Sequence, residues 1–141
     1  MRKRTVAAAT AFIVHDLAEA KAALAAAAET GRMVAIWSAP EAAIFAGTGW
    51  FAAVERRARA ANPKALARFV LDCGHRSDLV QEAFREGIKE ACFTGGSSLA
   101  ERLADIAVKS RARLHRRRPR ALDLGETTDP GSACRRLLGG G

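Results

Sequence analysis

Tyrosine is absent from this 141-residue chain, and its aromatic residues are two tryptophans and six phenylalanines. Cysteine is also scarce: Cys73, Cys92 and Cys134 are odd in number and show no CxxC spacing. This pattern argues against a disulfide framework and favours a reducing, cytoplasmic setting. No apolar stretch is long enough to cross a bilayer, so we expect no membrane partner.

The first 14 residues have a basic start followed by an apolar run, which is the outline of a secretory signal. The run leads directly into His15 and Asp16 without a cleavage region, so we expect no signal there. The length favours a single domain over residues 1–141, with a core from about residue 5 to 125. Lys and Arg number 23 against 15 for Asp and Glu, and the net charge of +8 suits an anionic partner.

Strand-like and helix-like segments alternate along the chain. Asp16 and Glu19 have the spacing of a capping box before the first helix, and Gly31 ends it. Pro40 suits a helix start, the pair Gly47 and Gly49 interrupts that helix, and Asn62-Pro63 ends it. The predicted strands are 10–16, 33–38, 65–72 and 88–94, and the predicted helices are 17–30, 40–61 with a break, 77–87 and 97–111.

Apolar strands without alternation, each followed by a helix, indicate a parallel sheet covered on both faces. We therefore predict a three-layer α/β/α fold of flavodoxin-like or Rossmann-like type, with four to five mostly parallel strands in the order 2-1-3-4-5. A fifth strand lies either near Leu114 or within 120–124. Asp129 and Pro130 predict a short last helix over about 130–138, before a frayed tail at 139–141.

The carboxyl ends of the strands are where an open parallel sheet binds ligands. We therefore predict a site for a small anionic, phosphorylated ligand at this rim. Its candidate residues follow the second, third and fourth strands: Ser38, Asp72, Thr94, Gly95, Gly96, Ser97 and Ser98.

The stretch "TGGSS" (94–98) has two interpretations. Backbone N–H groups after two glycines, at the start of a helix, can hold a phosphate. Alternatively, Ser98 and Glu101 form a capping box, and the stretch is then an ordinary turn. Both interpretations stay open on the sequence alone.

An enzymatic alternative places acid–base chemistry at the same rim, with Asp72 working beside His15 or His75. The spacing of these residues does not define a metal site, so no metal is predicted, and the sequence names no cofactor. Trp50 and Phe51, after the glycine break, suit either the core or the wall of a ligand pocket.

The βα order, with Asp72 after the third strand and Thr94 after the fourth, is similar to that of response-regulator receiver domains. This resemblance implies that Asp72 accepts a phosphate and that Thr94 senses it. The chain departs from that family in lacking paired acids at His15-Asp16 and in having Arg118-Pro119 where the family has Lys-Pro. The "TGGSS" turn also looks like the phosphate loops of (βα)-barrel enzymes, of which this chain could supply half.

A run of basic residues in the last third of the chain offers a competing function. Such a cluster can neutralise the phosphates of a nucleic acid, although no aromatic residue is interleaved for base stacking. A solvated arginine-rich edge that keeps an alanine-rich protein soluble, or that blunts an edge strand, explains the run equally. An interaction protein and a homo-oligomer are further alternatives. The candidate residues for nucleic acid are Arg113, Arg116, Arg117, Arg118 and Arg120.

Overall fold

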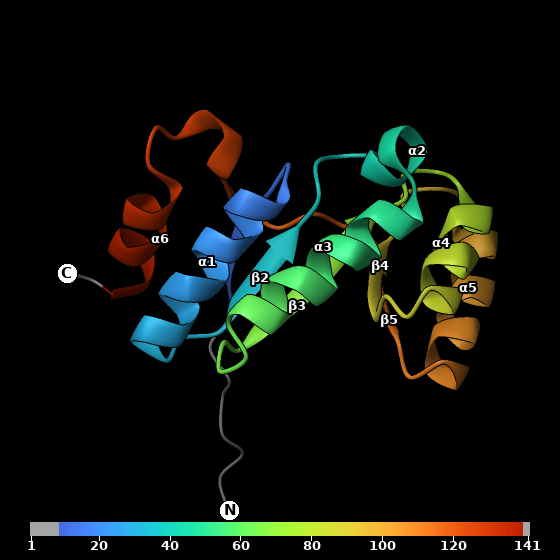
Figure 1. Ribbon diagram of the computed structural model, residues 1–141. Helices are drawn as coiled ribbons and strands as arrows, with labels where there is room; N and C mark the ends of the chain where they lie inside the picture. The colour runs from blue at the N-terminus through green and yellow to red at the C-terminus, as the bar shows by residue number, and fades with distance from the viewer. Residues whose placement is uncertain (1–8, 140–141) are drawn as a thin grey trace, which may run out of the picture.

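The computed structural model describes residues 9–139, which form six strands, six α-helices and one 3₁₀-helix (Figure 1). The predicted start of the core at residue 5 and the predicted tail residues 140–141 lie outside the described part. The strands are β1 (Thr10–Ile13), β2 (Val34–Trp37), β3 (Ala67–Asp72), β4 (Glu90–Cys92), β5 (Arg113–His115) and β6 (Leu122–Asp123). The helices are α1 (Leu17–Thr30), α2 (Ala42–Ala46), α3 (Thr48–Ala61), α4 (Ser77–Arg85), α5 (Ser97–Lys109), η1 (Leu124–Glu126) and α6 (Pro130–Gly139).

Local capping signals set several of these helix ends. The Asp16 side chain accepts a hydrogen bond from the Glu19 N–H, and Gly31 at φ 70° closes α1, as predicted. Gly47 at φ 86° separates α2 from α3. The prediction that the second helix starts at Pro40 is wrong: Glu41 is left-handed at φ 58°, so helical geometry begins at Ala42.

The sheet is six-stranded and entirely parallel, which confirms the predicted α/β class with a parallel sheet. The predicted order 2-1-3-4-5 is wrong. The observed order is β5-β4-β3-β2-β1-β6, because each connection from β1 to β5 steps to the adjacent strand in the same direction. Both candidate positions for a fifth strand form strands, as β5 and β6.

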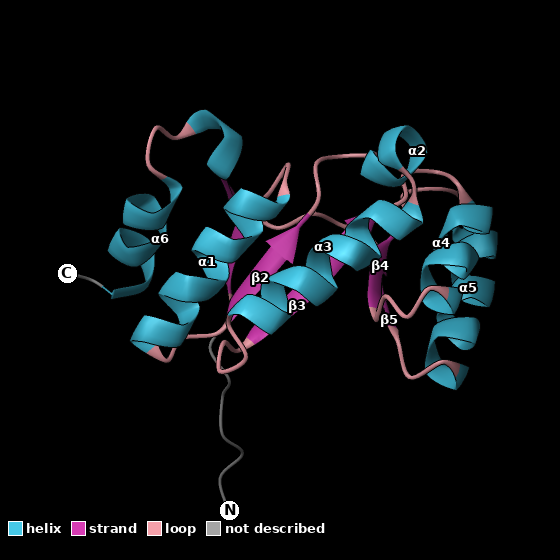
Figure 2. Ribbon diagram, viewed as in Figure 1, coloured by secondary structure: helices cyan, strands magenta, loops and turns pink. Residues whose placement is uncertain are grey.

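The helices form one row on one side of the sheet, in the series α6, α1, α3, α4 and α5. Figures 1 and 2 show α1 and α3 crossing in front of the strands. Successive right-handed connections in one direction produce this arrangement, because each places its helix on the same face. Phe12, Ile36 and Leu71 point to that side and join the main core with residues of the helices.

The other face of the sheet carries no helix among the described residues. Its buried residues, including Trp37 and Val70, cluster with strand residues and with Ala121. Where the three-layer prediction places a second set of helices, the structure has residues 116–121, which run from β5 to β6. We call them the crossing segment. They run opposite to the earlier connections, so a right-handed path takes them over the opposite face.

Two phenylalanines that differ in burial should respond to alanine with effects of different size on the free energy of unfolding. Phe51 is fully buried in the main core, whereas Phe45 on α2 is 83% exposed. Phe51→Ala should lower the free energy of unfolding by about 3–5 kcal/mol, because it removes buried surface and leaves a cavity. Phe45→Ala should change it by less than about 0.5 kcal/mol. Urea unfolding followed by circular dichroism measures both, and equal effects would contradict this description of the core.

Candidate functional site

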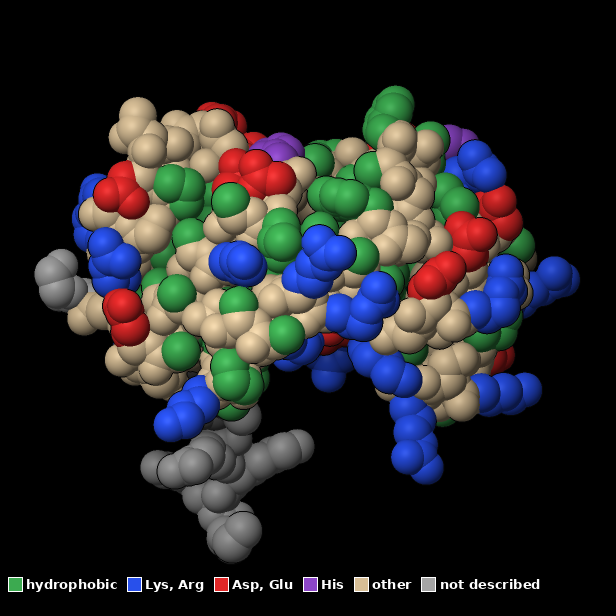
Figure 3. All heavy atoms as spheres, in the orientation of Figure 1, with side chains coloured by type: hydrophobic (Ala, Val, Ile, Leu, Met, Phe, Trp, Pro, Cys, Tyr) green, Lys and Arg blue, Asp and Glu red, His purple; other side chains and the backbone are tan. Residues whose placement is uncertain are grey.

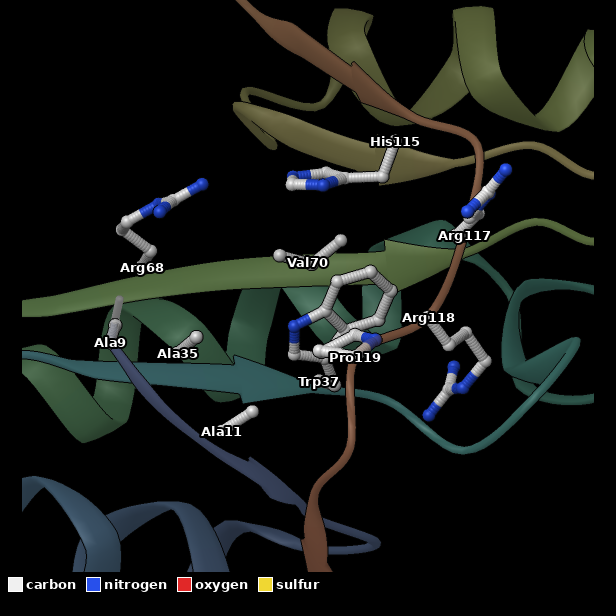
Figure 4. A pocket seen from close by; sticks show the side chains of 10 residues that line it. All are labelled: Ala9, Ala11, Ala35, Trp37, Arg68, Val70, His115, Arg117, Arg118 and Pro119. Atoms are coloured by element: carbon white, nitrogen blue, oxygen red, sulfur yellow. The ribbon is translucent and has the colours of Figure 1, made fainter. Parts of the chain in front are cut away.

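A pocket of about 300 Å³ lies on the face of the sheet without helices (Figure 4). Alternate residues of a strand point to opposite faces, so the neighbours of the core residues in β1, β2 and β3 form its floor. Figure 4 shows Arg117 and Arg118 at one end, Arg68 at the other, and small side chains between them. We call it the sheet-face pocket; its lining residues are Ala9, Ala11, Ala35, Trp37, Arg68, Val70, His115, Arg117, Arg118 and Pro119.

The crossing segment forms the roof at one end of this pocket. Five strand spacings separate β5 from β6, which is about 24 Å. Seven residue steps, from His115 to Leu122, span at most about 25 Å when extended. The segment therefore has little slack. Pro119, with its fixed φ and no N–H group to satisfy, suits this extended path.

Arg118 fastens the crossing segment to the sheet. Its Nη1 donates to Asp72 Oδ2 at 2.8 Å, and its Nη2 donates to the carbonyl oxygen of Ser38, also at 2.8 Å. Its guanidinium lies 5.1 Å from the centre of the Trp37 ring, a cation–π contact. Asp72 is 2% exposed, and its other oxygen accepts the Gly74 N–H.

Ser38 and Asp72, which we predicted to contact a ligand, thus contact each other and the crossing segment. The Ser38 hydroxyl accepts the Asp72 N–H at 2.9 Å and donates to the Ala39 carbonyl. These bonds join the carboxyl ends of β2 and β3 directly beside the pocket. Both residues hold Arg118, and Arg118 forms one wall of the pocket.

Glu90 is the centre of a second charged cluster on this face. Its carboxylate accepts two hydrogen bonds from Arg68, at 2.7 and 2.8 Å, and one from His115 at 2.7 Å. Burial by itself raises the pKa of Glu90, but the bonds and charges of Arg68 and His115 outweigh burial and lower it to about 2. The three side chains come from β3, β4 and β5, and two of them, Arg68 and His115, line the pocket. His115 also meets Trp37 edge-on, with ring centres 5.2 Å apart.

The "TGGSS" turn leads into α5, which begins at Ser97 with Gly96 as its cap and no side-chain capping bond. The predicted capping box of Ser98 and Glu101 is therefore wrong. Gly95 has a packing role, because a Cβ there would overlap the buried Phe93 ring. Thr94, Gly96, Ser97 and Ser98 are exposed.

Arg116, a residue of the crossing segment, forms hydrogen bonds with the backbone at this turn. Its guanidinium donates to the Phe93 carbonyl at 2.7 Å and to the Gly95 carbonyl at 2.9 Å. It also lies over the Phe93 ring. The turn is thus fixed by contacts within the protein.

The candidate acid–base residues lie in separate hydrogen-bond networks. His15 Nε2 bonds Asp123 Oδ1 at 2.7 Å, and Asp72 bonds Arg118. His75 is exposed and forms no hydrogen bond within residues 9–139. Of the two aromatic residues after the glycine break, Phe51 is in the core, whereas Trp50 lines a different, apolar cleft with Phe45.

The arginines proposed for nucleic acid divide into two groups. Arg118 and the exposed Arg116 form hydrogen bonds within the protein, whereas the exposed side chains of Arg113, Arg117 and Arg120 form none within residues 9–139. On the opposite, helix-covered side, Figure 3 shows Lys and Arg side chains interspersed with acidic ones. Among the described residues, some basic side chains therefore bond other groups of the protein, and others lie free on its surface.

Other types of site find no support in residues 9–139. No group of three His, Cys, Asp or Glu side chains is placed to hold a metal. Burial raises the pKa of the Cys73 thiol to about 12, and the nearby Asp72 carboxylate adds to this shift, so the thiol is protonated at neutral pH. None of the helices in this range combines the length and apolarity needed to cross a bilayer.

No protein-family model matches the chain, and a search of curated proteins found no match. The site is therefore interpreted from its own geometry.

Sequence reasoning missed Trp37, Arg68, Glu90 and His115 as members of one site. A signal for them was present, since Arg68 and Glu90 are charged residues inside predicted strands. Charged groups in a buried strand need partners. Their pairing across adjacent strands also required the register of the sheet, which the sequence did not supply.

The two glycines of the turn should respond differently to alanine. Gly95→Ala should lower the free energy of unfolding by about 1–3 kcal/mol, because the new Cβ overlaps the Phe93 ring. Gly96 has φ −62° and open space at its Cβ position, so Gly96→Ala is the matched control with little effect. Thermal unfolding measures both, and a stable Gly95→Ala protein would contradict the described packing.

Glu90 should make stability depend on pH. Folding lowers the pKa of the Glu90 carboxyl from 4.5 to about 2. Its ionised form therefore stabilises the folded protein fully at pH values above 4.5, and this stabilisation is lost as the pH falls through about 2. Unfolding experiments on the wild type and Glu90→Gln should therefore show a stability difference that narrows between pH 5 and pH 2. A constant difference over this range would show that the ion cluster does not form.

Proposed function

We propose that this protein is a binding module for a small anionic ligand, which it holds in the sheet-face pocket. The observation that carries the proposal is the combination of an apolar floor with basic side chains at the edges. Ligand pockets are mostly apolar and contain a few polar groups that fix orientation. Here Arg117 supplies an exposed guanidinium, which is suited to planar, two-point recognition of an anion.

The pocket is a better anion site than the "TGGSS" turn. Packing against the Phe93 ring accounts for the glycine at position 95, and Arg116 donates a hydrogen bond to the Gly95 carbonyl. The pocket instead leaves space that the described residues do not fill. Asp72 is engaged by Arg118 and Gly74, an arrangement that favours a positioning role over phosphate acceptance or acid–base chemistry.

The same geometry disfavours nucleic acid as the main partner. Trp37 is 2% exposed and is covered by Arg118 and His115, so its ring offers no stacking surface for a base. The exposed arginines would then give non-specific affinity alone. We include a cytoplasmic location in the proposal, since Cys73, Cys92 and Cys134 are all unbridged.

Tryptophan fluorescence tests the proposal, because Trp37 lines the pocket. The Trp50→Phe protein isolates the Trp37 signal, since these are the two tryptophans of the chain. Titration with benzoate, phenyl phosphate and sulfate should change the Trp37 emission for at least one anion, and the same anion should raise the melting temperature. Arg117→Ala should weaken this binding by about tenfold or more, because a hydrogen bond to a charged group contributes about 1.5–3 kcal/mol.

Ala35→Leu is the matched steric test. Ala35 forms part of the floor, so a larger side chain occupies the pocket and should abolish the fluorescence change while the protein stays folded. Arg120→Ala, an exposed arginine of the same segment outside the lining, is the control and should bind as the wild type does. The proposal fails if none of the three anions binds, or if Ala35→Leu binds normally.

A further inference from the structure

We infer that the ligand of the sheet-face pocket is a small monocarboxylic acid with a flat apolar body. This inference rests on the proposed function and narrows its class of ligand. It differs from the prediction from sequence, which was a phosphorylated ligand. Two observations carry it: the balance of charge among the lining residues and the shape of the floor.

Among the lining residues that the structure describes, the charge balance leaves one positive charge for a ligand. Arg68 is paired with Glu90 through two hydrogen bonds, and Arg118 is paired with Asp72. Arg117 is the one arginine of the lining that has no acidic partner within residues 9–139. A single negative charge on the ligand matches this excess.

A dianionic phosphate would fit these walls less well. The carboxylates of Glu90 and Asp72 are 12% and 3% exposed and stand behind the two paired arginines. A second negative charge on the ligand would face them, and the described lining residues offer no further arginine or lysine to compensate it. Like charges in a partly dry site repel strongly, because the surrounding dielectric is lower than that of water. Arg113 and Arg120 are exposed and outside the lining, so solvent screens them.

The floor determines the shape of the ligand body. Ala9, Ala11, Ala35 and Val70 contribute small side chains to it, and the larger Trp37 ring stands beside them (Figure 4). A flat ring can lie against such a surface, whereas a long flexible chain would lose more conformational freedom on binding. The volume of about 300 Å³ is at the lower end for ligand pockets, which limits the body to one or two rings.

Four probes that differ by one property each test this inference by isothermal titration calorimetry. They are benzoate (flat, one negative charge), phenyl phosphate (flat, two charges), benzamide (flat, neutral) and acetate (one charge, no flat body). The assay runs at pH 8.5, two units above the ordinary pKa of histidine, so that the charge balance concerns arginine alone. We expect benzoate to bind at least tenfold more tightly than each of the other three.

Glu90→Gln tests the charge balance directly. The change keeps the size of the side chain but removes its charge, so Arg68 loses its counter-charge and the pocket gains a second net positive charge. The ratio of phenyl phosphate affinity to benzoate affinity should then rise at least fivefold above that of the wild type. Arg117→Gln should weaken benzoate at least tenfold, and Arg117→Lys should restore part of that loss. Circular dichroism confirms that each variant is folded.

The outcomes separate this inference from the proposed function. If phenyl phosphate binds the wild type as tightly as benzoate and depends on Arg117, the pocket binds anions but the monocarboxylate inference is wrong. An unchanged affinity ratio in a folded Glu90→Gln protein also overturns it. If acetate and benzoate bind with equal affinity, the inference that the ligand has a flat apolar body is wrong. If benzamide equals benzoate, or if no anion binds, the proposed function itself fails.

Discussion

The Arg118 guanidinium joins three elements of the structure that are distant in sequence. It bonds the carboxylate of Asp72 at the end of β3 and the carbonyl of Ser38 after β2, and it covers the ring of Trp37. Asp72 is almost fully buried, and a buried carboxylate without a partner is strongly destabilising. The position of the crossing segment and the burial of the Asp72 carboxylate therefore depend on each other. Because the segment has little slack, this one attachment also fixes where the pocket begins.

The topology explains why a pocket exists on this face. Strands β1 to β5 in consecutive order, with α6, α1, α3, α4 and α5 in a row on one side, have the arrangement of an opened (βα)-barrel. In a closed barrel, bulky side chains from all strands fill the inner face. Among the described residues, that face meets a single segment, residues 116–121. Small residues such as Ala11 and Ala35 leave space beside Trp37 that the described residues do not occupy.

Much of the fold could be predicted because it depends on local signals. Asp16, Gly31 and Pro130 set helix ends through backbone geometry that neighbouring residues determine, and α1 and α6 begin where these residues predict. Strand order depends on the direction of each crossover, and no local pattern in β1 or β2 encodes it. The same limit applied to the site: Ser38 and Asp72 were correctly placed at the carboxyl ends of their strands. Their contact with Arg118, more than forty residues further along the chain, depends on the path of the crossing segment.

The basic run around residues 113–120 shows why charge alone was ambiguous. In sequence it resembles a surface for polyanions, but each arginine meets a different environment. Arg116 bonds backbone carbonyls of the "TGGSS" turn, and Arg118 neutralises Asp72. Arg117, between them, lies in a bend of the chain and forms neither of these contacts. A run of three arginines thus supplies two attachments to groups within the protein and one side chain that has no acidic partner among the described residues, beside an apolar pocket. This division of roles, rather than the total charge of the run, gives the pocket its capacity to bind an anion.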